Sequence, residues 1–235
     1  MALFVQLAEL AEQMAATASR LKKRAAIAEA IAAIHAAQPQ SEDAGLFALY
    51  LAGEPFAESD SRKLSAGGAL LSKAIFAVSG ASEAALAAAY RRHGDLGAAA
   101  FDLLAGERLS GGATNGFAAT TLPLSLTEVA AAFGAMAGAR STASRGALVE
   151  GLLRRATRLE VKYLIKLMLG DMRIGVKQSL VEEAIAHAAS TPEVAVGAAA
   201  VRHAVMLEAD LGSAVGRAFA GTLREARMRL FHPLG

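Results

Sequence analysis

The sequence contains no cysteine and no tryptophan, and only five of its 235 residues are proline. Without thiols the chain has neither disulfides nor thiolate metal sites, which fits a cytoplasmic protein. Hydrophobic residues make up 54% of the chain but aromatic residues only 5%, because alanine is abundant. Alanine and leucine favour helix, and no alternating run of β-branched residues indicates a strand. We therefore predict an all-α fold of about a dozen helices with no sheet.

Long apolar runs are also missing. No stretch of about 18 apolar residues is free of charge and glycine, so no transmembrane helix is predicted. No basic segment precedes the apolar residues at the N-terminus, and Glu9 and Glu12 interrupt them, which argues against a signal peptide. We expect no membrane partner.

Sequence motifs of catalysis are absent as well. The chain has no Lys-x-Asp-Gly nucleotidyl-acceptor motif, no Walker phosphate loop, no His-Glu-x-x-His and no Gly-x-Ser-x-Gly. The five histidines are scattered, so no metal site is predicted. Composition and spacing alone favour a helical binding module over a catalyst.

Positive charge is present but unevenly distributed. The net charge is +2, yet residues 140–177 hold nine basic and three acidic residues, and the rest of the chain holds fifteen basic and nineteen acidic residues. A local excess of this kind attracts polyanions. On charge alone, a solvated helix face is an equally good explanation.

One stretch of this basic region has a distinctive pattern. Leu164, Leu167 and Met168 share a helix face, and Gly170 stands where a glycine ends a helix. A turn with Arg173 and Gly175 follows, and the next helix is predicted to begin near residue 176. A glycine-bounded turn among cations can bring backbone N–H groups close to an anion.

The two halves of the chain resemble each other. Thr17-Ala18-Ser19-Arg20 recurs as Thr142-Ala143-Ser144-Arg145, and Gly94-Asp95-Leu96-Gly97 parallels Ala209-Asp210-Leu211-Gly212. We predict an internal duplication with two pseudo-symmetric helical lobes: lobe 1 over 3–106, a linker over 107–122 and lobe 2 over 123–221, with 222–235 as an exit tail. A helical repeat that serves only core packing would explain the same pattern.

Residues 164–175, Leu-Ile-Lys-Leu-Met-Leu-Gly-Asp-Met-Arg-Ile-Gly, resemble the signature of the N-terminal DNA-binding domain of ATP-dependent DNA ligases. Further matches follow the family's order over about residues 5–221: Ser19-Arg20-Leu21, Arg62-Lys63-Leu64 through Gly67 to Leu70-Leu71, Gly94-Asp95-Leu96-Gly97, the Ser/Thr turn at 141–145, and Asp210-Leu211-Gly212.

The resemblance implies an all-α domain of two similar lobes that binds nicked double-stranded DNA through the minor groove and phosphates, without sequence specificity. It implies ATP and Mg²⁺ for the full-length enzyme and no cofactor in this fragment. The catalytic core would belong to the same polypeptide. Because the catalytic lysine motif is absent, we expect a fragment of a longer ligase that is inactive alone, and we expect it to be a monomer.

Carried over by position, the resemblance implies DNA contacts from two turns in the second lobe and two in the first. These residues are Thr142, Ala143, Ser144, Arg145, Arg173, Gly175, Lys177, Ser19, Arg20, Gly67 and Gly68. The family often has alternating glycines and a downstream lysine in the Ser/Thr turn. This sequence has Thr142, Ala143 and Gly146 there, which leaves the number of phosphate contacts open. The alternative function is a helical-repeat protein-interaction module without a DNA role.

Overall fold

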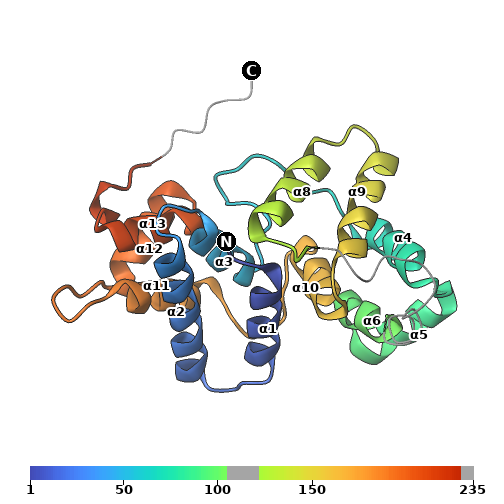
Figure 1. Ribbon diagram of the computed structural model, residues 1–235, viewed down its shortest axis with the longest axis horizontal. Helices are drawn as coiled ribbons and strands as arrows, with labels where there is room; N and C mark the ends of the chain where they lie inside the picture. Colours follow the sequence, from blue (N-terminus) through green and yellow to red (C-terminus); the bar gives the residue numbers. More distant parts are fainter. Residues whose placement is uncertain (105–121, 229–235) are drawn as a thin grey trace. The chain divides into compact units, whose positions relative to one another are not determined.

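The computed structural model describes residues 1–104 and 122–228, and within them the chain is all-α (Figure 1). No strand occurs in these residues; a single antiparallel bridge joins Leu3 to Ser125. The elements are α1 (Phe4–Ala15), α2 (Arg20–Ala37), α3 (Asp43–Leu51), α4 (Gly68–Ser79), α5 (Glu83–His93), α6 (Leu96–Leu103), α8 (Leu126–Gly138), α9 (Thr142–Arg155), α10 (Arg158–Met168), α11 (Gln178–Ala189), α12 (Ala198–Glu208), α13 (Leu211–Ala220) and the 3-10 helix η1 (Leu223–Glu225).

Side-chain caps set most of the helix starts. Ser19, Ser82, Asp95 and Asp210 each accept a hydrogen bond from a backbone N–H in the first turn of the helix that follows. At α8, Ser125 forms a reciprocal capping box with Glu128.

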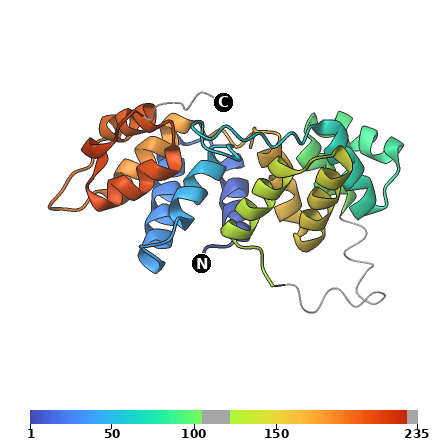
Figure 2. The same cartoon turned by 90° about the horizontal axis from the view of Figure 1, so that it is seen from above.

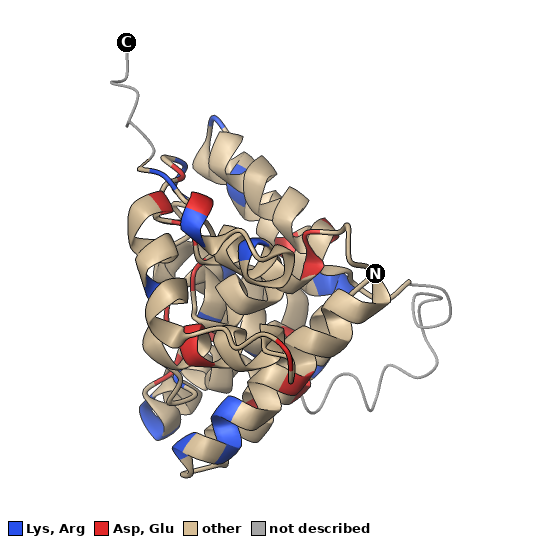
Figure 3. Cartoon of the chain, turned by 90° about the vertical axis from the view of Figure 1, so that its left-hand side faces the viewer, with Lys and Arg blue, Asp and Glu red and all other residues tan. Residues whose placement is uncertain are grey.

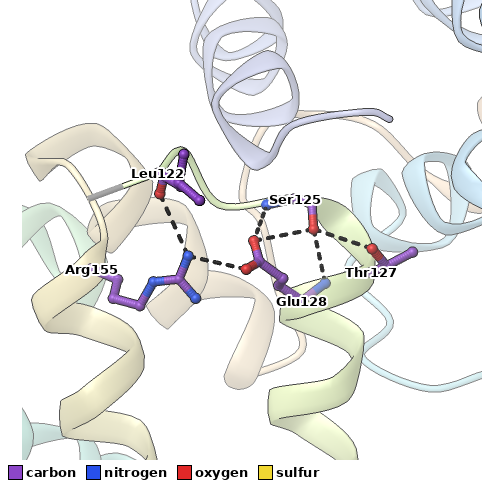
Figure 4. A network of polar contacts seen from close by, with 5 residues as sticks. All are labelled: Leu122, Ser125, Thr127, Glu128 and Arg155. Atoms are coloured by element: carbon purple, nitrogen blue, oxygen red, sulfur yellow. Dashed lines mark hydrogen bonds and ion pairs between the residues drawn. The ribbon is translucent and has the colours of Figure 1, made fainter. Parts of the chain in front are cut away.

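The Glu128 box is linked to a further ion pair (Figure 4). The Ser125 N–H donates to Glu128 Oε2 at 2.8 Å, and Arg155 donates to Glu128 Oε1 at 3.1 Å. The pKa of Glu128 is lowered, first by the Ser125 backbone N–H and then by Arg155. The start of α8 is thereby tied to the last turn of α9.

The chain divides into two compact units, each assembled from segments far apart in sequence (Figures 1 and 2). Unit 1 comprises Met1–Ala2, Leu10–Arg62 and Arg173–Gly235; unit 2 comprises Leu3–Glu9 and Lys63–Met172. These boundaries differ from the consecutive lobes expected over 3–106 and 123–221. Similarity between two halves of a sequence does not determine which segments pack together. Of the predicted linker and tail, residues 107–121 and 229–235 lie outside the described residues.

In unit 1, α2 packs on α11, and α3 packs on α13. Ile27 and Ile31 of α2 are fully buried, as is Ile185 of α11. The α3–α13 contact depends on two glycines: a Cβ added to Gly45 would lie 2.7 Å from the carbonyl oxygen of Gly212. The first and last thirds of the chain therefore share one core.

In unit 2, α4 packs on α9, and α6 packs on α10. Leu71 of α4 and Val149 of α9 are fully buried. Lys166 of α10 forms a buried ion pair with Asp95, the N-cap of α6. Because an unpaired charge in such a site would be costly, this pair ties α6 to α10.

The repeated segments on which the predicted duplication rests lie at helix starts. Asp95 and Asp210 have the same role, since each caps the helix that follows. The two Thr-Ala-Ser-Arg segments do not: Ser19 caps α2, whereas Ser141, three residues before Ser144, caps α9. The duplication and its pseudo-symmetry stay a prediction.

Among the described residues, no single helix has both the length and the apolar composition to cross a membrane. Taken together, α4 and α5 reach that length and composition, but they are bent by 116° at their junction.

Candidate nucleic-acid interface

Unit 1 brings together two predicted contact segments that are about 150 residues apart in sequence. The ammonium of Lys23, in the first turns of α2, donates to the carbonyl oxygens of Ile174 at 2.9 Å and Gly175 at 3.2 Å. Arg20, the first residue of α2, forms an ion pair of 2.7 Å with Glu183 of α11. The Ser19–Arg20 segment and the turn that carries Arg173 therefore belong to one surface region.

The turn between α10 and α11 has a constrained backbone. Gly170 has φ +79°, as expected for a glycine that ends a helix, and Gly175 has φ +65°. Arg173 is left-handed too, with φ +51°, which is costly for a residue with a Cβ. A Cβ on Gly175 would lie 2.5 Å from the Lys23 ammonium nitrogen. The glycine at 175 therefore makes room for Lys23, besides leaving its backbone exposed.

The N-terminus of α11 has no side-chain cap. Its N-cap is Lys177, whose side chain accepts no hydrogen bond, and Lys177 and Gln178 are exposed. Within the described residues, no backbone N–H of residues 175–177 donates a hydrogen bond to another protein group. These donors lie beside the positive end of the α11 dipole, so they can bind an anion there.

Unit 2 has a similar helix start at α4. Gly67 is its N-cap and makes no side-chain cap, and Gly67 and Gly68 are both exposed. A Cβ added to either glycine would have no atom within 4 Å, so neither is needed for packing inside the protein. The start of α4 can therefore accept the close approach of an external group.

The predicted Ser/Thr turn is instead the first turn of α9. Ser141 caps this helix, and Thr142, Ala143 and Ser144 are helical and exposed. The Ser144 hydroxyl faces back to Ser141, with an Oγ–Oγ distance of 2.9 Å. The sequence pattern did not place the helix start because the cap lies one residue before the Thr-Ala-Ser-Arg segment.

Arg145 contacts the protein itself. Its guanidinium donates to the carbonyl oxygens of Met136 at 3.1 Å and Ala139 at 3.0 Å, at the C-terminal end of α8. A cation there satisfies carbonyls that have no helical partner. Arg145 therefore orients α8 against α9, a role that the sequence did not indicate.

Cations gather where α2 begins. Arg20, Lys22, Lys23 and Arg24 lie within the first five residues of that helix. In Figure 3, several Lys and Arg segments lie at the lower end of the view, the end at which α2 starts in Figure 1, and others lie higher up. Among the described residues, no group of three or more His, Asp or Glu side chains could hold a metal ion. The chemistry available here is anion binding by cations and backbone N–H groups.

Comparison with known proteins identifies the family. The model of the DNA ligase N terminus matches residues 3–186. This chain belongs to that family. It is 40% identical over 97% of its length to a "Probable DNA ligase" of Koribacter versatilis and 34% identical over 98% to one of Opitutus terrae. It is also 32% identical over 89% of its length to a "DNA ligase" of Methanopyrus kandleri.

These relatives are longer than the chain. The chain spans 36%, 24% and 35% of the three proteins, respectively. The family model covers the start of α2, the starts of α4 and α9, and the turn before α11, so all the predicted contact residues lie inside the matched region.

Proposed function

We propose that this chain is the DNA-binding part of an ATP-dependent DNA ligase. It grips nicked double-stranded DNA without sequence specificity, through the minor groove and the phosphates. A nucleotidyltransferase domain of the same polypeptide seals the nick with ATP and Mg²⁺. Such a grip accelerates sealing because a fixed orientation of the two strand ends lowers the barrier. The part described here acts as a monomer.

One observation carries the proposal: of the four described helix starts without a side-chain cap, those of α3, α4, α11 and α12, two lie at positions that the ligase resemblance assigns to DNA contact. Most other helices begin with Ser, Thr or Asp caps, whereas α4 and α11 begin at Gly67 and Lys177. Their first-turn N–H groups are suited to phosphate oxygens. Arg20, Arg173 and Lys177 add cations on unit 1.

The same residues support binding without sequence specificity. Cations, small hydroxyl residues and glycine backbone contact phosphate and sugar, which position a protein on DNA but carry no sequence information. The exposed residues of the candidate regions include no Asn or aromatic side chain, and Gln178 is the single amide among them. Readout of base edges would need more such groups.

A salt series on a nicked duplex tests the proposal. If Arg20, Arg173 and Lys177 each neutralise a phosphate, log K should fall against log salt with a slope of about −3 or steeper. Two unrelated duplex sequences should give equal dissociation constants. A slope near zero would refute the DNA-binding role and favour the protein-interaction module.

Labelled ATP provides a second test. The described residues offer no nucleotidyl acceptor of the Lys-x-Asp-Gly kind, so no covalent adduct should form with this chain. A stable protein–AMP adduct would contradict the proposal that adenylation takes place in a separate catalytic domain.

A further inference from the structure

Lys23 is a cation that the proposed interface does not use for direct contact. It is 8% exposed, whereas its neighbour Lys22 is exposed. A buried ammonium is costly unless it is hydrogen-bonded. Lys23 directs two of its three donors at the carbonyl oxygens of Ile174 and Gly175. It therefore links α2 to the turn that leads into α11.

These two bonds orient the turn. In a planar trans peptide the C=O and N–H groups point in opposite directions. Because the carbonyls of Ile174 and Gly175 face Lys23, the N–H groups of Gly175 and Val176 point away from it. Gly175 lies between the two peptide groups, and its left-handed backbone lets both carbonyls face one ammonium.

Gly175 and Lys23 are matched sterically as well. The 2.5 Å between an added Cβ and the ammonium nitrogen is too short for any side chain. A residue with a Cβ at this position would have to displace Lys23 and also adopt an unfavourable backbone conformation. The orientation of the turn therefore depends on both residues together.

We propose that Lys23 is a positioning residue for DNA binding. Its ammonium holds the peptide groups on either side of Gly175 so that the N–H groups of Gly175 and Val176 face a phosphate, and Lys23 itself does not touch DNA. This inference rests on the proposed function.

Four variants of the 235-residue chain test the proposal: K23M, G175A, the double variant and the control K22M. K23M keeps the aliphatic stem and should weaken binding to a nicked duplex about tenfold, the loss that corresponds to one charge-assisted hydrogen bond. K22M removes the same charge from an exposed neighbour and should weaken binding less than about threefold. Fluorescence anisotropy gives the dissociation constants, and circular dichroism shows that each variant is folded.

The double variant separates positioning from direct contact. G175A disturbs the same turn from the other side, so K23M/G175A should bind within about twofold of K23M. If the double variant instead loses affinity by the product of the two single losses, Lys23 contacts DNA independently and the proposal is overturned. Equal losses in K22M and K23M would overturn it too, because bulk charge would then explain both.

If K23M does not fold, G175A alone decides. It retains every charge and should still bind about tenfold more weakly. Unchanged affinity in folded G175A contradicts the inference. Absence of salt-dependent binding by the unsubstituted chain instead refutes the proposed function, and it is seen before any variant is made.

Discussion

Arg173 is a proposed phosphate contact, and its backbone is also strained. Its φ of +51° places it in the left-handed region, which costs an L residue about 1–2 kcal/mol. Two substitutions separate the side chain from the backbone: R173A removes the guanidinium and keeps the strain, whereas R173G removes both. If the charge serves DNA binding, both variants should lose the same affinity and differ only in stability.

The expected stability difference follows from two opposing effects. Glycine relieves the left-handed strain, but it also gains about 0.4–1 kcal/mol of conformational entropy in the unfolded chain. R173G should therefore be more stable than R173A by about 1 kcal/mol. For a chain of this size, that corresponds to a melting temperature about 2–4 °C higher.

Thermal unfolding and a salt series on nicked duplex measure the two effects separately. Each variant should lower the slope of log K against log salt by about 0.9, the contribution of one phosphate contact. Wild-type slopes in both variants would refute the phosphate contact. Equal melting temperatures for R173A and R173G would refute the strain argument, whatever the DNA result.

Four further variants extend these tests. Ala209 is left-handed too, with φ +49° at the C-terminal end of α12. A209G should therefore stabilise the fold by about 0.5–1 kcal/mol in thermal unfolding and leave DNA binding unchanged. Reduced DNA affinity would show that glycine at such sites disturbs the interface. G68E places a carboxylate at the start of α4, where nothing lies within 4 Å of an added Cβ; the melting temperature should hold or rise through the helix dipole, and anisotropy should show several-fold weaker DNA binding. E183Q releases Arg20 from a half-exposed ion pair, so DNA affinity should rise at low salt while stability changes by less than about 1 kcal/mol; unchanged affinity would argue that Arg20 does not face DNA. Hydrogen bonds lower the pKa of Glu128 in the folded state, so the stability it contributes is complete above the unfolded pKa of about 4.3 and is lost as pH falls through the lower folded value. In E128Q the free energy of unfolding should therefore depend less on pH in this acid range.

Local patterns in the sequence predicted the helices well, because caps are local chemistry. Ser19, Asp95 and Ser125 are of the residue types that favour helix starts, and each accepts a first-turn hydrogen bond. Gly170 was expected to end a helix, and its positive φ confirms it. Helix α12 is different: it begins at Ala198, and its N-cap, Gly197, has no side chain to signal the start.

Residue roles that depend on distant partners could not be derived in this way. A DNA contact of Arg145 stays a prediction, and the structure adds a role that the sequence did not indicate, because its guanidinium donates to two carbonyls at the end of α8. Glu182 and Glu183 are adjacent and chemically alike in the sequence, yet Glu182 is 4% exposed in its side chain and paired with Arg202. Burial and partner depend on neighbouring helices, which adjacent sequence does not specify.

The amino-acid order therefore established the helical class, the family and the positions of the glycine-bounded turn, because helix caps and family motifs involve residues within a few positions of one another. Which segments share a core was decided only on folding. Residues 10–62 and 173–235 form one unit, and Lys23 reaches Gly175 across that core. The free energy of packing depends on contacts between surfaces far apart in the chain, and such contacts leave no local pattern in the sequence.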